Sequence, residues 1–591
     1  MLKELCYPFD DELIMRKKKR FKRELLSGET NFLDKRIAVL GGSTTHQIIE
    51  MLELFLLNLG IRPTFYESVY AQYWQDAVLG NEKLDRFRPE LIFVHTSNRN
   101  IRRFPSLSSS EREIEALINV QYCGFLEMWD RLAERFKAPI IQNNFELPAY
   151  RLLGNKDVSD IRGRTHHISK LNQMFYEYAQ QHNNFYINDI AYLSAAYGLE
   201  RWSEPLAWHM YKCAMSLSAI PAFSFNVANI IKSIYGKNKK ALVLDLDNTL
   251  WGGVIGDDGP EGIELGQESS SGQVYSEFQE YIKAHKALGV MLCVNSKNEY
   301  ENALLGLNHE NGTLSPEDFV CIKANWQNKD MNITEIAGEM NILPESLVFV
   351  DDNPFERALV AGNTAAAVPE MGIPEDYIRI LDRSGFFEIT LVSEDDLARN
   401  EMYAANIKRQ NAATTFADYE SYLASLDMEA EISRLKEGNI QRVTQLANKS
   451  NQFNLTTKRY TAAEMEEITK DKTRIAIFGR LKDSYGDNGI VSVVIGRIEK
   501  ESVHIELWLM SCRVLKRDME LAMLDEFVRR ARKNGANRLV GYYIKSAKNA
   551  MVQDFYPKLG FSAFGENDGD DTVWELDISN YKNKSKYIKL I

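Results

Sequence analysis

The sequence is poor in cysteine, in long apolar runs and in basic charge, and each shortage excludes a class of protein. Its 6 cysteines among 591 residues have no paired spacing, which argues against zinc sites or a disulfide framework and favours a reducing compartment. We find neither an apolar N-terminal stretch of signal-peptide length nor a run of about eighteen apolar residues, so we expect a cytoplasmic protein without a membrane partner. The net charge of −12 argues against a general nucleic-acid binder, which needs a basic face.

One local exception to the acidic balance is the basic run Arg16–Arg23, RKKKRFKR. Such a run can meet an acidic partner, for which an acyl carrier protein is one candidate. It can equally be the solvated face of a first helix. Both interpretations stay open at this stage.

Acidic residues follow a short apolar run, Ala241–Leu244, which is typical of a buried strand. Asp245 and Asp247 lie two positions apart, and the glycines Gly252 and Gly253 provide a place to turn. Carboxylates crowded at a strand end repel each other, and a divalent cation is the usual remedy. The alternative is a solvated acidic turn.

Two later apolar runs end in polar clusters of the same kind. Val290–Val294 is followed by Asn-Ser-Lys-Asn, and Leu347–Val350 by Asp-Asp-Asn-Pro, with a helical pattern beginning near Lys329 between them. Strands that alternate with helices predict a parallel sheet, whose ligand lies outside the carboxyl ends of the strands. We therefore expect the polar clusters to converge on one edge.

The order of these motifs resembles the haloacid dehalogenase (HAD) phosphotransferase superfamily. Asp-x-Asp-x-Thr comes first, then a serine, a lysine and an Asp-Asp pair, each after the expected strand or before the expected helix. The wider phrases DLDNTLWGGVIGDDG, VNSKN, ANWQNKDMNI and VFVDDNPFER are similar to its FkbH-like branch, of subfamily IIIC, and the resemblance covers nearly the whole chain. It implies a Mg²⁺-dependent phosphatase that removes phosphate from 1,3-bisphosphoglycerate and loads the glyceryl unit onto an acyl carrier protein.

Each step of phosphoryl transfer has a candidate residue. Asp245 fits the nucleophile that forms an aspartyl-phosphate, and Asp247 fits the general acid and base. Ser296 can hydrogen-bond a phosphoryl oxygen, and Lys329 can supply positive charge in the transition state. For Lys329 the alternative is a solvated lysine at a helix start.

The expected Mg²⁺ site consists of Asp245, the backbone carbonyl of Asp247, and Asp352. In HAD relatives either member of such an acidic pair is the ligand, and we assign that role to Asp352. Asp351 is expected to orient Lys329 or a water on the metal. Together with Asp351, the remaining substrate-binding candidates are Thr249 and Asn298.

The HAD-like core leaves no room for a cap domain, because only 45 residues separate Leu250 from Ser296 and part of them form a helical pattern. A site without a cap is open to water unless another domain or a partner covers it. Large substrates, or substrates tethered to a carrier, become plausible.

Residues 1–235 are predicted to form a separate α/β domain similar to the SGNH hydrolase fold. A strand at 36–40 ends in Gly-Gly-Ser, which places Ser43 on a strand-to-helix turn, where a serine acts as a nucleophile or binds an anion. The match is partial, because Gly-Gly-Ser replaces Gly-Asp-Ser and no aspartate stands three residues before His209. An esterase that uses Ser43 and His209 is therefore an alternative function, and a binding or docking role for this domain is favoured.

The length of 591 residues predicts about three or four domains. We assign 236–385 to a capless, Rossmann-like HAD core with a parallel sheet and 386–427 to a helical connector. Residues 428–591 resemble the α+β fold of GNAT acyltransferases, which makes a GNAT-type acyltransferase a further alternative. The whole chain is thus predicted to be a multidomain α/β protein.

The loop at Arg513–Asp518 lacks the two glycines that usually cradle coenzyme A in GNAT folds, which favours the arm of a carrier protein in the same groove. Cys512 stands beside Arg513 and is the one cysteine we nominate as an acyl acceptor. The alternative for Cys512 is a small buried core thiol.

Overall fold

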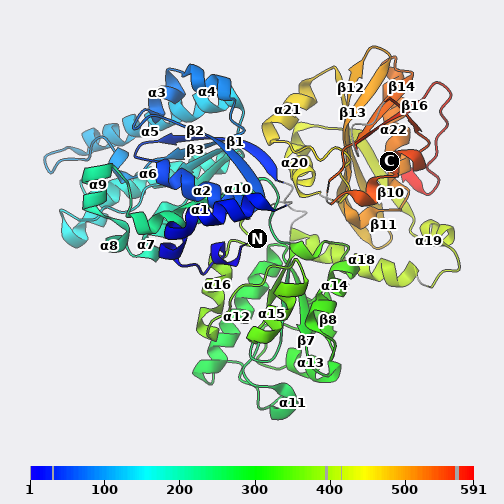
Figure 1. Cartoon of the computed structure of the whole chain (residues 1–591), viewed down its shortest axis with the longest axis horizontal. Coiled ribbons are helices and arrows are strands. Elements are labelled where there is room, and N and C mark those ends of the chain that lie inside the picture. Colours follow the sequence, from blue (N-terminus) through cyan, green and yellow to red (C-terminus); the bar gives the residue numbers. More distant parts are fainter. Residues whose placement is uncertain are drawn as a thin grey trace. The chain divides into compact units, whose positions relative to one another are not determined.

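The computed structural model describes residues 2–28, 32–392, 397–413, 415–450, 452–546, 548–565 and 571–591 (Figure 1). The chain divides into two compact units: Met1–Ile234 with Thr461–Glu464, and Tyr235–Tyr460 with Met465–Ile591. Below, residues 236–385 are called the central part and residues 428–591 the C-terminal part. Both belong to the second unit except for Thr461–Glu464, and the division into four domains stays a prediction.

The first unit is built on a five-stranded parallel sheet in the order β2-β1-β3-β4-β5. Its strands are β1 (Leu33–Gly41), β2 (Ile61–Glu67), β3 (Leu91–His95), β4 (Ile140–Asn143) and β5 (Phe185–Asn188). The run predicted at 36–40 thus forms β1, which lies between β2 and β3. Strands β1, β3 and β4 are buried on both faces, as expected for a parallel sheet covered by helices.

The helices of this unit include α1 (Asp11–Ser27), α2 (His46–Asn58), α5 (Glu111–Phe136), α6 (Arg164–Gln181), α9 (Pro205–Tyr211) and α10 (Ile220–Ile234). Helices α2 and α10 lie side by side (Figure 1). One described helical stretch, Leu217–Ile234, is long and apolar enough to cross a membrane, but 67% of it is buried within the protein. Such burial is typical of a core helix.

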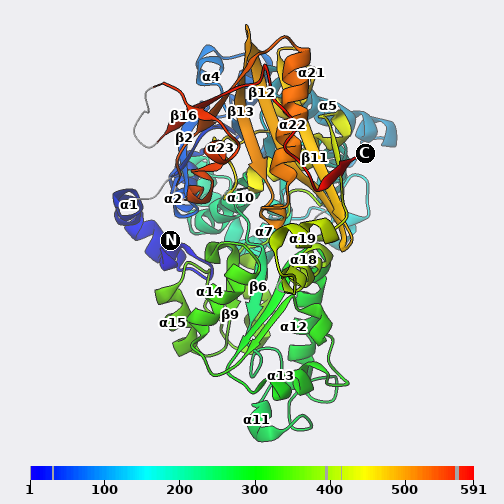
Figure 2. The ribbon, with the colours of Figure 1, turned by 90° about the vertical axis from the view of Figure 1, so that its right-hand side faces the viewer.

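The central part contains a four-stranded parallel sheet in the order β8-β7-β6-β9. The strands are β6 (Ala241–Leu244), β7 (Met291–Ser296), β8 (Cys321–Ala324) and β9 (Leu347–Val350). Alternate side chains of each strand point to opposite faces, and both faces are buried. Leu242 and Leu244 pack with α12 (Ser270–Ala287), whereas Ala241 and Val243 pack with α14 (Lys329–Glu339) and α15 (Pro354–Asn363) (Figure 2).

The C-terminal part is an eight-stranded mixed sheet in the order β15-β16-β14-β13-β12-β11-β10-β17. Its long central strands are β11 (Arg474–Asp483), β12 (Gly486–Glu499) and β13 (Ser502–Met510), and α22 (Met519–Lys533) packs on them. The outer strands are β10 (Met428–Arg434), β14 (Arg538–Tyr543), β15 (Ser562–Ala563), β16 (Thr572–Asp577) and β17 (Ile588–Leu590). The predicted fold class, α/β with an α+β C-terminal part, is confirmed.

Two helices of the connector precede this sheet, α18 (Arg399–Ala413) and α19 (Tyr419–Ser425). Helix α18 is tied to the central part at the amino end of β7, because the Arg399 guanidinium donates to the carbonyl of Gly289 (3.0 Å) and the Asn400 amide donates to the carbonyl of Lys286 (2.8 Å). The amino-end edge of the central sheet is therefore covered by the connector.

Candidate active site

The polar clusters predicted to converge do lie on one edge of the central sheet. Asp245 follows β6, Asp351 and Asp352 follow β9, Ser296 is the last residue of β7, and Lys329 begins α14. The last residue of β6, Leu244, pairs with Val350 of β9 on one side and with Val294 of β7 on the other, so the carboxyl ends of the three strands lie side by side. The carboxyl ends of these strands therefore form a single acidic edge, which Lys329 joins from the start of α14.

Lys329 stands between two carboxylates in the interior of this edge. Its Nζ is 2.9 Å from Asp245 Oδ1 and 2.6 Å from Asp351 Oδ2, and its side chain is only 3% exposed. Burial opposes a charged ammonium, but the charges of Asp245 and Asp351 outweigh it and raise the pKa of Lys329. The lysine is therefore a fixed positive charge and not a solvated residue at a helix start.

The two members of the Asp351-Asp352 pair have different partners. Asp351 is fully buried, and its two oxygens accept from Lys329 and from the backbone amide of Asn353 (2.8 Å). Asp352 is half-buried, and its backbone amide donates to Thr249 Oγ1 (3.2 Å). Burial and the charge of Asp245 raise the pKa of both carboxyl groups. This geometry favours Asp351 as the residue that orients Lys329 and leaves Asp352 available to a cation.

The carboxylate of Asp247 is held by three hydrogen-bond donors. Its Oδ1 accepts from the indole of Trp251 (2.9 Å) and the amide of Ile255 (3.1 Å), and its Oδ2 accepts from the amide of Asn298 (3.1 Å). Burial raises the pKa of Asp247, while the Ile255 amide and Trp251 indole oppose that rise. A fixed carboxyl group with a raised pKa suits proton transfer to a leaving group.

Backbone and side-chain bonds fix the loops that carry these groups. Arg357 donates to the carbonyls of Asp351 (2.9 Å) and Asp352 (2.7 Å), and the Tyr377 hydroxyl donates to the carbonyl of Asn248 (3.2 Å). Asn248 has a positive φ of 54°, which bends the chain directly after Asp247. Ser296 is buried beside them at the end of β7.

The donor set fits a divalent cation. Asp245, Asp351 and Asp352 each contribute one carboxylate oxygen, and these oxygens lie within 4.8 Å of one another. Asp245 Oδ1 is buried, and no donor in the described part of the chain is aligned with it for a hydrogen bond although Lys329 Nζ is near. Clustered hard oxygens are the ligands that Mg²⁺ prefers. Asp245 and Asp352 would hold the ion, and the carbonyl of Asp247 stays a predicted ligand.

The edge carries no inserted domain. Between β6 and β7 the structure has only the short α11 (Ile255–Asp258) and α12, and between β7 and β8 it has α13 (Tyr300–Leu307) and a single turn of 3₁₀ helix. Residues 245–320 all lie in the described part of the chain. The predicted absence of a cap within these two intervals is therefore observed.

Sequence reasoning did not assign Trp251, Arg357 or Tyr377, although all three support the site. Trp251 and Arg357 lie inside the phrases that carry the family resemblance, which was the one signal available. Their roles depend on the groups to which their side chains donate hydrogen bonds in the folded protein. The sequence alone does not specify that.

Ser43 and His209 are placed in the first unit without a bond between them. Ser43 follows β1 and is 2% exposed, and its hydroxyl has no hydrogen-bond partner in the described part of the chain. His209 lies on α9 and is exposed. The amide of Thr44 donates to the carbonyl of Lys212 (3.0 Å), so the serine loop adjoins the end of α9. The pairing of Ser43 with His209 stays a prediction.

Cys512 lies near the amino-end edge of the central sheet. Its carbonyl accepts from the Asn341 amide (2.8 Å), in the turn between α14 and β9, and its thiol lies near Tyr403 of α18. Lys240, which immediately precedes β6, interacts electrostatically with the thiol. Cys512 and the acidic site are therefore at opposite edges of one sheet, and the role of Cys512 as acyl acceptor stays a prediction.

Three comparisons with known proteins agree with this description in part. Residues 36–232 match the family described as FkbH, N-terminal domain. No curated protein sequence matches the chain. A crystal structure of the N-terminal part of the protein BF1531 from Bacteroides fragilis, described as containing a phosphatase domain complexed with Mg, is 29% identical with a TM-score of 0.59, over 63% of this chain and 99% of that one.

Acetyltransferases match over about a quarter of the chain. Examples are the Escherichia coli ribosomal-protein-S18-alanine N-acetyltransferase (14% identity, TM-score 0.21, 26% of this chain and 96% of that one) and the Vibrio cholerae spermidine N-acetyltransferase (13%, 0.21, 26% and 96%). These scores are too low to support a conclusion. The N-terminal family match, the similarity to a Mg-complexed phosphatase-domain protein and the acidic edge together support an FkbH-like phosphatase of the HAD type.

Proposed function

We propose that this chain is a Mg²⁺-dependent phosphatase that acts on 1,3-bisphosphoglycerate and delivers the glyceryl unit to an acyl carrier protein. The observation that carries the phosphatase half is the position of Asp245. Its buried Oδ1 has no aligned donor, lies 2.9 Å from the Lys329 ammonium and sits in a cluster of three carboxylates. A carboxylate oxygen beside a fixed cation is suited to attack phosphorus.

Three residues have separate roles in phosphoryl transfer. Asp245 attacks the phosphorus of the 3-phosphate, and the bond from phosphorus to the substrate oxygen breaks. Asp247 gives that oxygen a proton and later takes one from the water that cleaves the aspartyl-phosphate. Lys329 neutralises charge on the transferring group. Bound Mg²⁺ would supply further positive charge for the phosphate oxygens.

The acyl half of the reaction needs a thiol. The carrier's thiol attacks the C1 carbonyl carbon, the bond from that carbon to the phosphate oxygen breaks, and the thiol proton goes to solvent. The sum is one substrate, one carrier thiol and one water giving a glyceryl thioester and two phosphates. The absence of an inserted cap in residues 245–320 supports a substrate that arrives on, or leaves with, a large carrier.

The test is mass spectrometry of the carrier together with an assay of released phosphate. The protein is incubated with 1,3-bisphosphoglycerate, Mg²⁺ and a phosphopantetheinylated acyl carrier protein. Wild type is compared with Asp245→Asn and with the control Asp257→Asn, which changes an exposed carboxylate on α11. We expect a glyceryl adduct lacking phosphate in wild type and the control.

In Asp245→Asn we expect release of the 3-phosphate to fall by at least about 10³-fold, because the nucleophile is lost. Phosphate release without any adduct on the carrier would leave a phosphatase and contradict the glyceryl half. Full activity in Asp245→Asn would contradict the phosphatase half.

A further inference from the structure

Helix α1 carries a stripe of basic side chains along one side. Arg16, Lys19, Arg20 and Arg23 are spaced by three and four residues, which puts them on one face of the helix, and all four are exposed. From the rise of the helix the stripe is about 10 Å long. These four residues are called the basic stripe below.

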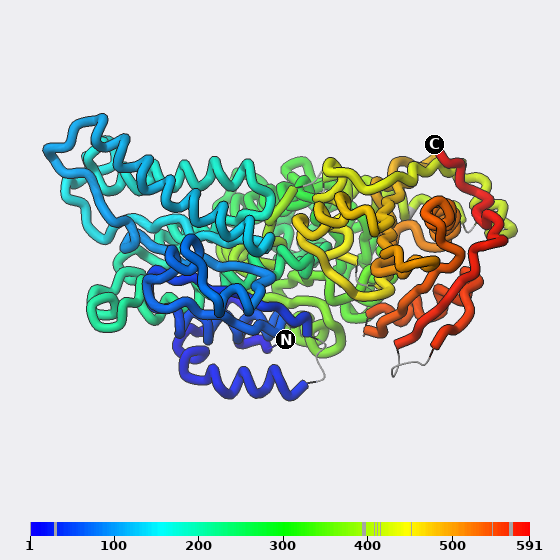
Figure 3. Tube along the Cα trace, turned by 90° about the horizontal axis from the view of Figure 1, so that it is seen from above, coloured from blue at the N-terminus to red at the C-terminus, as the bar shows by residue number. Residues whose placement is uncertain are grey.

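The opposite side of α1 is anchored to its own unit. Ile14 and Phe21 are buried, and Lys18 and Lys22 each lie 2.6 Å from a glutamate of α2, Glu50 and Glu53. The anchoring fixes the rotation of the helix about its axis. Figure 3 shows α1, in blue near the N-terminus, at the outside of the first unit. The basic stripe is therefore held outward.

Most residues of the basic stripe form no ion pair in the described part of the chain. Arg20 approaches Glu24 at 3.9 Å, whereas no ion pair within the described ranges involves Arg16, Lys19 or Arg23. This differs from Lys18 and Lys22 on the same helix, which are both paired. Three neighbouring cations thus remain for an external anionic group.

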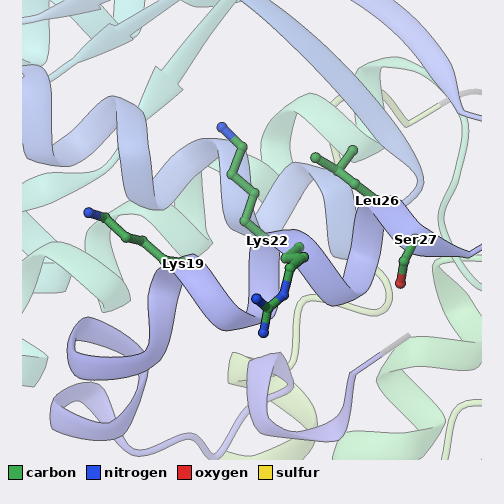
Figure 4. Close-up of a pocket in the computed structure, with 5 residues that line it drawn as sticks. Lys19, Lys22, Leu26 and Ser27 are labelled. Carbon is green, nitrogen blue, oxygen red and sulfur yellow. The ribbon is translucent and has the colours of Figure 1, made fainter.

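A shallow hollow of about 510 Å³ adjoins the C-terminal half of the stripe. Lys19, Lys22, Arg23, Leu26 and Ser27 line it (Figure 4). Leu26 is 45% exposed there, so an apolar contact is available beside the cations. A surface that combines a few cations with one exposed leucine can make both charged and apolar contacts with a protein helix.

The charge of the rest of the chain restricts where an acidic partner can approach. The net charge is −12, and repulsion over most of the surface would favour encounter at a local positive region. The stripe is one helix wide and bordered by Glu24, Glu50 and Glu53. A bilayer or a nucleic acid needs a broad basic face, whereas an acidic helix needs only a matching row of cations.

We propose that the basic stripe and Leu26 form the docking surface for an acidic helix of the acyl carrier protein. This inference rests on the proposed function, because it names where the partner of the acidic site binds. The docking surface would hold the carrier that receives the acyl group.

The test measures carrier binding by a charge-reversed variant. The triple variant Arg16→Glu, Lys19→Glu, Arg23→Glu is titrated with a phosphopantetheinylated acyl carrier protein, and Kd is measured at low and at physiological salt. We expect Kd to rise by at least about tenfold in the variant. In wild type we expect binding to weaken as salt is added.

A matched control has the same change in net charge elsewhere on the first unit. It reverses three exposed basic residues that are far from α1 in sequence, Lys83→Glu, Arg112→Glu and Lys170→Glu. Unfolding curves of both variants check that they fold. A tenfold loss in the stripe variant with a loss under about twofold in the control supports docking at the stripe.

Equal losses in the two variants, or unchanged binding by the stripe variant, would overturn the proposal. Vesicles of anionic lipid are tested in parallel, and stripe-dependent binding to vesicles without binding to the carrier would also overturn it. Mg²⁺-dependent release of phosphate from p-nitrophenyl phosphate is measured on the same samples. If the wild type releases no phosphate from p-nitrophenyl phosphate, the proposed phosphatase function is contradicted and the docking surface is not. The two failures are therefore distinguishable.

Discussion

At the scale of single residues, Lys329 is what allows three carboxylates to share one sheet edge. The ammonium is 3% exposed and within 2.9 Å of both Asp245 and Asp351. Removing one partner of a buried ion pair leaves the other charge uncompensated, which costs more than the pair itself contributes. The lysine is therefore important for stability as well as for charge in the reaction.

We predict that Lys329→Met lowers the free energy of unfolding by about 3 kcal/mol. Part of that loss should return when Asp351→Asn is added, because the buried negative charge then disappears. Urea unfolding without Mg²⁺ measures the free energy of unfolding of the single and the double variant. The control is Lys323→Met on β8, whose partners Glu335 and Glu339 are nearly half exposed, so its loss should stay below about 1 kcal/mol. Equal losses at the two lysines would contradict the argument.

The carboxylate cluster predicts a metal effect on stability that does not depend on turnover. Mg²⁺ that binds only the folded state stabilises it by about 2.7 kcal/mol at a concentration of 100 Kd. We expect Mg²⁺ to raise Tm in wild type and in Asp257→Asn but not in Asp352→Asn. An undiminished rise in Asp352→Asn would assign the ion to other ligands.

Glu146 predicts a pH dependence in the first unit, far in sequence from the acidic edge. Burial raises the pKa of Glu146 from 4.5 to about 7, opposed in part by the amide of Asn98. The folded state therefore binds a proton more tightly than the unfolded state between these values, and stability falls as pH rises through that window. The shift corresponds to about 3 kcal/mol above the window.

Glu146→Gln removes the buried charge and should remove this loss. Its free energy of unfolding, relative to wild type, should rise by about 3 kcal/mol between about pH 4 and pH 8. Urea unfolding across that range is the measurement, and Glu115→Gln, at an exposed position on α5, is the control. A difference that stays constant with pH would mean that Glu146 is not protonated in the folded protein.

At the scale of elements, α13 supports Asp247, the proposed general acid, through Trp251. Trp251 is fully buried and donates to Asp247, and its ring packs on Gly306 of α13. A Cβ added at Gly306 would lie 2.6 Å from Cη2 of Trp251. The glycine is needed for close packing of the indole and not for an unusual backbone conformation.

We predict that Gly306→Ala destabilises the protein by about 1–3 kcal/mol, the usual cost of overpacking, and lowers kcat because the indole shifts away from Asp247. Gly338→Ala on α14 is the control, since nothing lies within 4 Å of its added Cβ. That change should stabilise by about 0.5–1 kcal/mol. Stabilisation in both variants would contradict the prediction, because it would show that α13 shifts to accommodate the methyl group added at Gly306.

Much of the central part could be predicted from the sequence because its strands are unbroken apolar runs that end in charged residues. Those strand ends predict that Asp245, Ser296 and Asp352 lie on one edge. Strand β8 was not predicted, since it is only four residues long and Lys323 interrupts its apolar residues. Strand β17 was also missed, because it is three residues long and pairs with distant β10. Long-range pairing of this kind leaves no local pattern.

At the scale of the whole second unit, the central sheet separates two sets of chemical groups. Lys240 immediately precedes β6 and Asp245 immediately follows it, so about 16 Å of extended backbone lies between them. Cys512 is on the Lys240 side, where Asn341 contacts its carbonyl. Residues this far apart with no shared partner act almost independently.

We predict that Cys512→Ala releases phosphate at a rate within about twofold of wild type. Asp245→Asn, measured beside it, should abolish release. A large loss of phosphate release in Cys512→Ala would contradict the separation of the two edges.

The two edges also determine how an acyl group can travel within one turnover. On the prediction that Cys512 accepts an acyl group, a group that leaves the acidic edge must be carried around the central part to Cys512 on a tether. Transfer then depends on the effective concentration of the tethered group at the thiol, which is set by the length and stiffness of the tether. Shortening the tether would stop transfer to Cys512 while leaving each site intact.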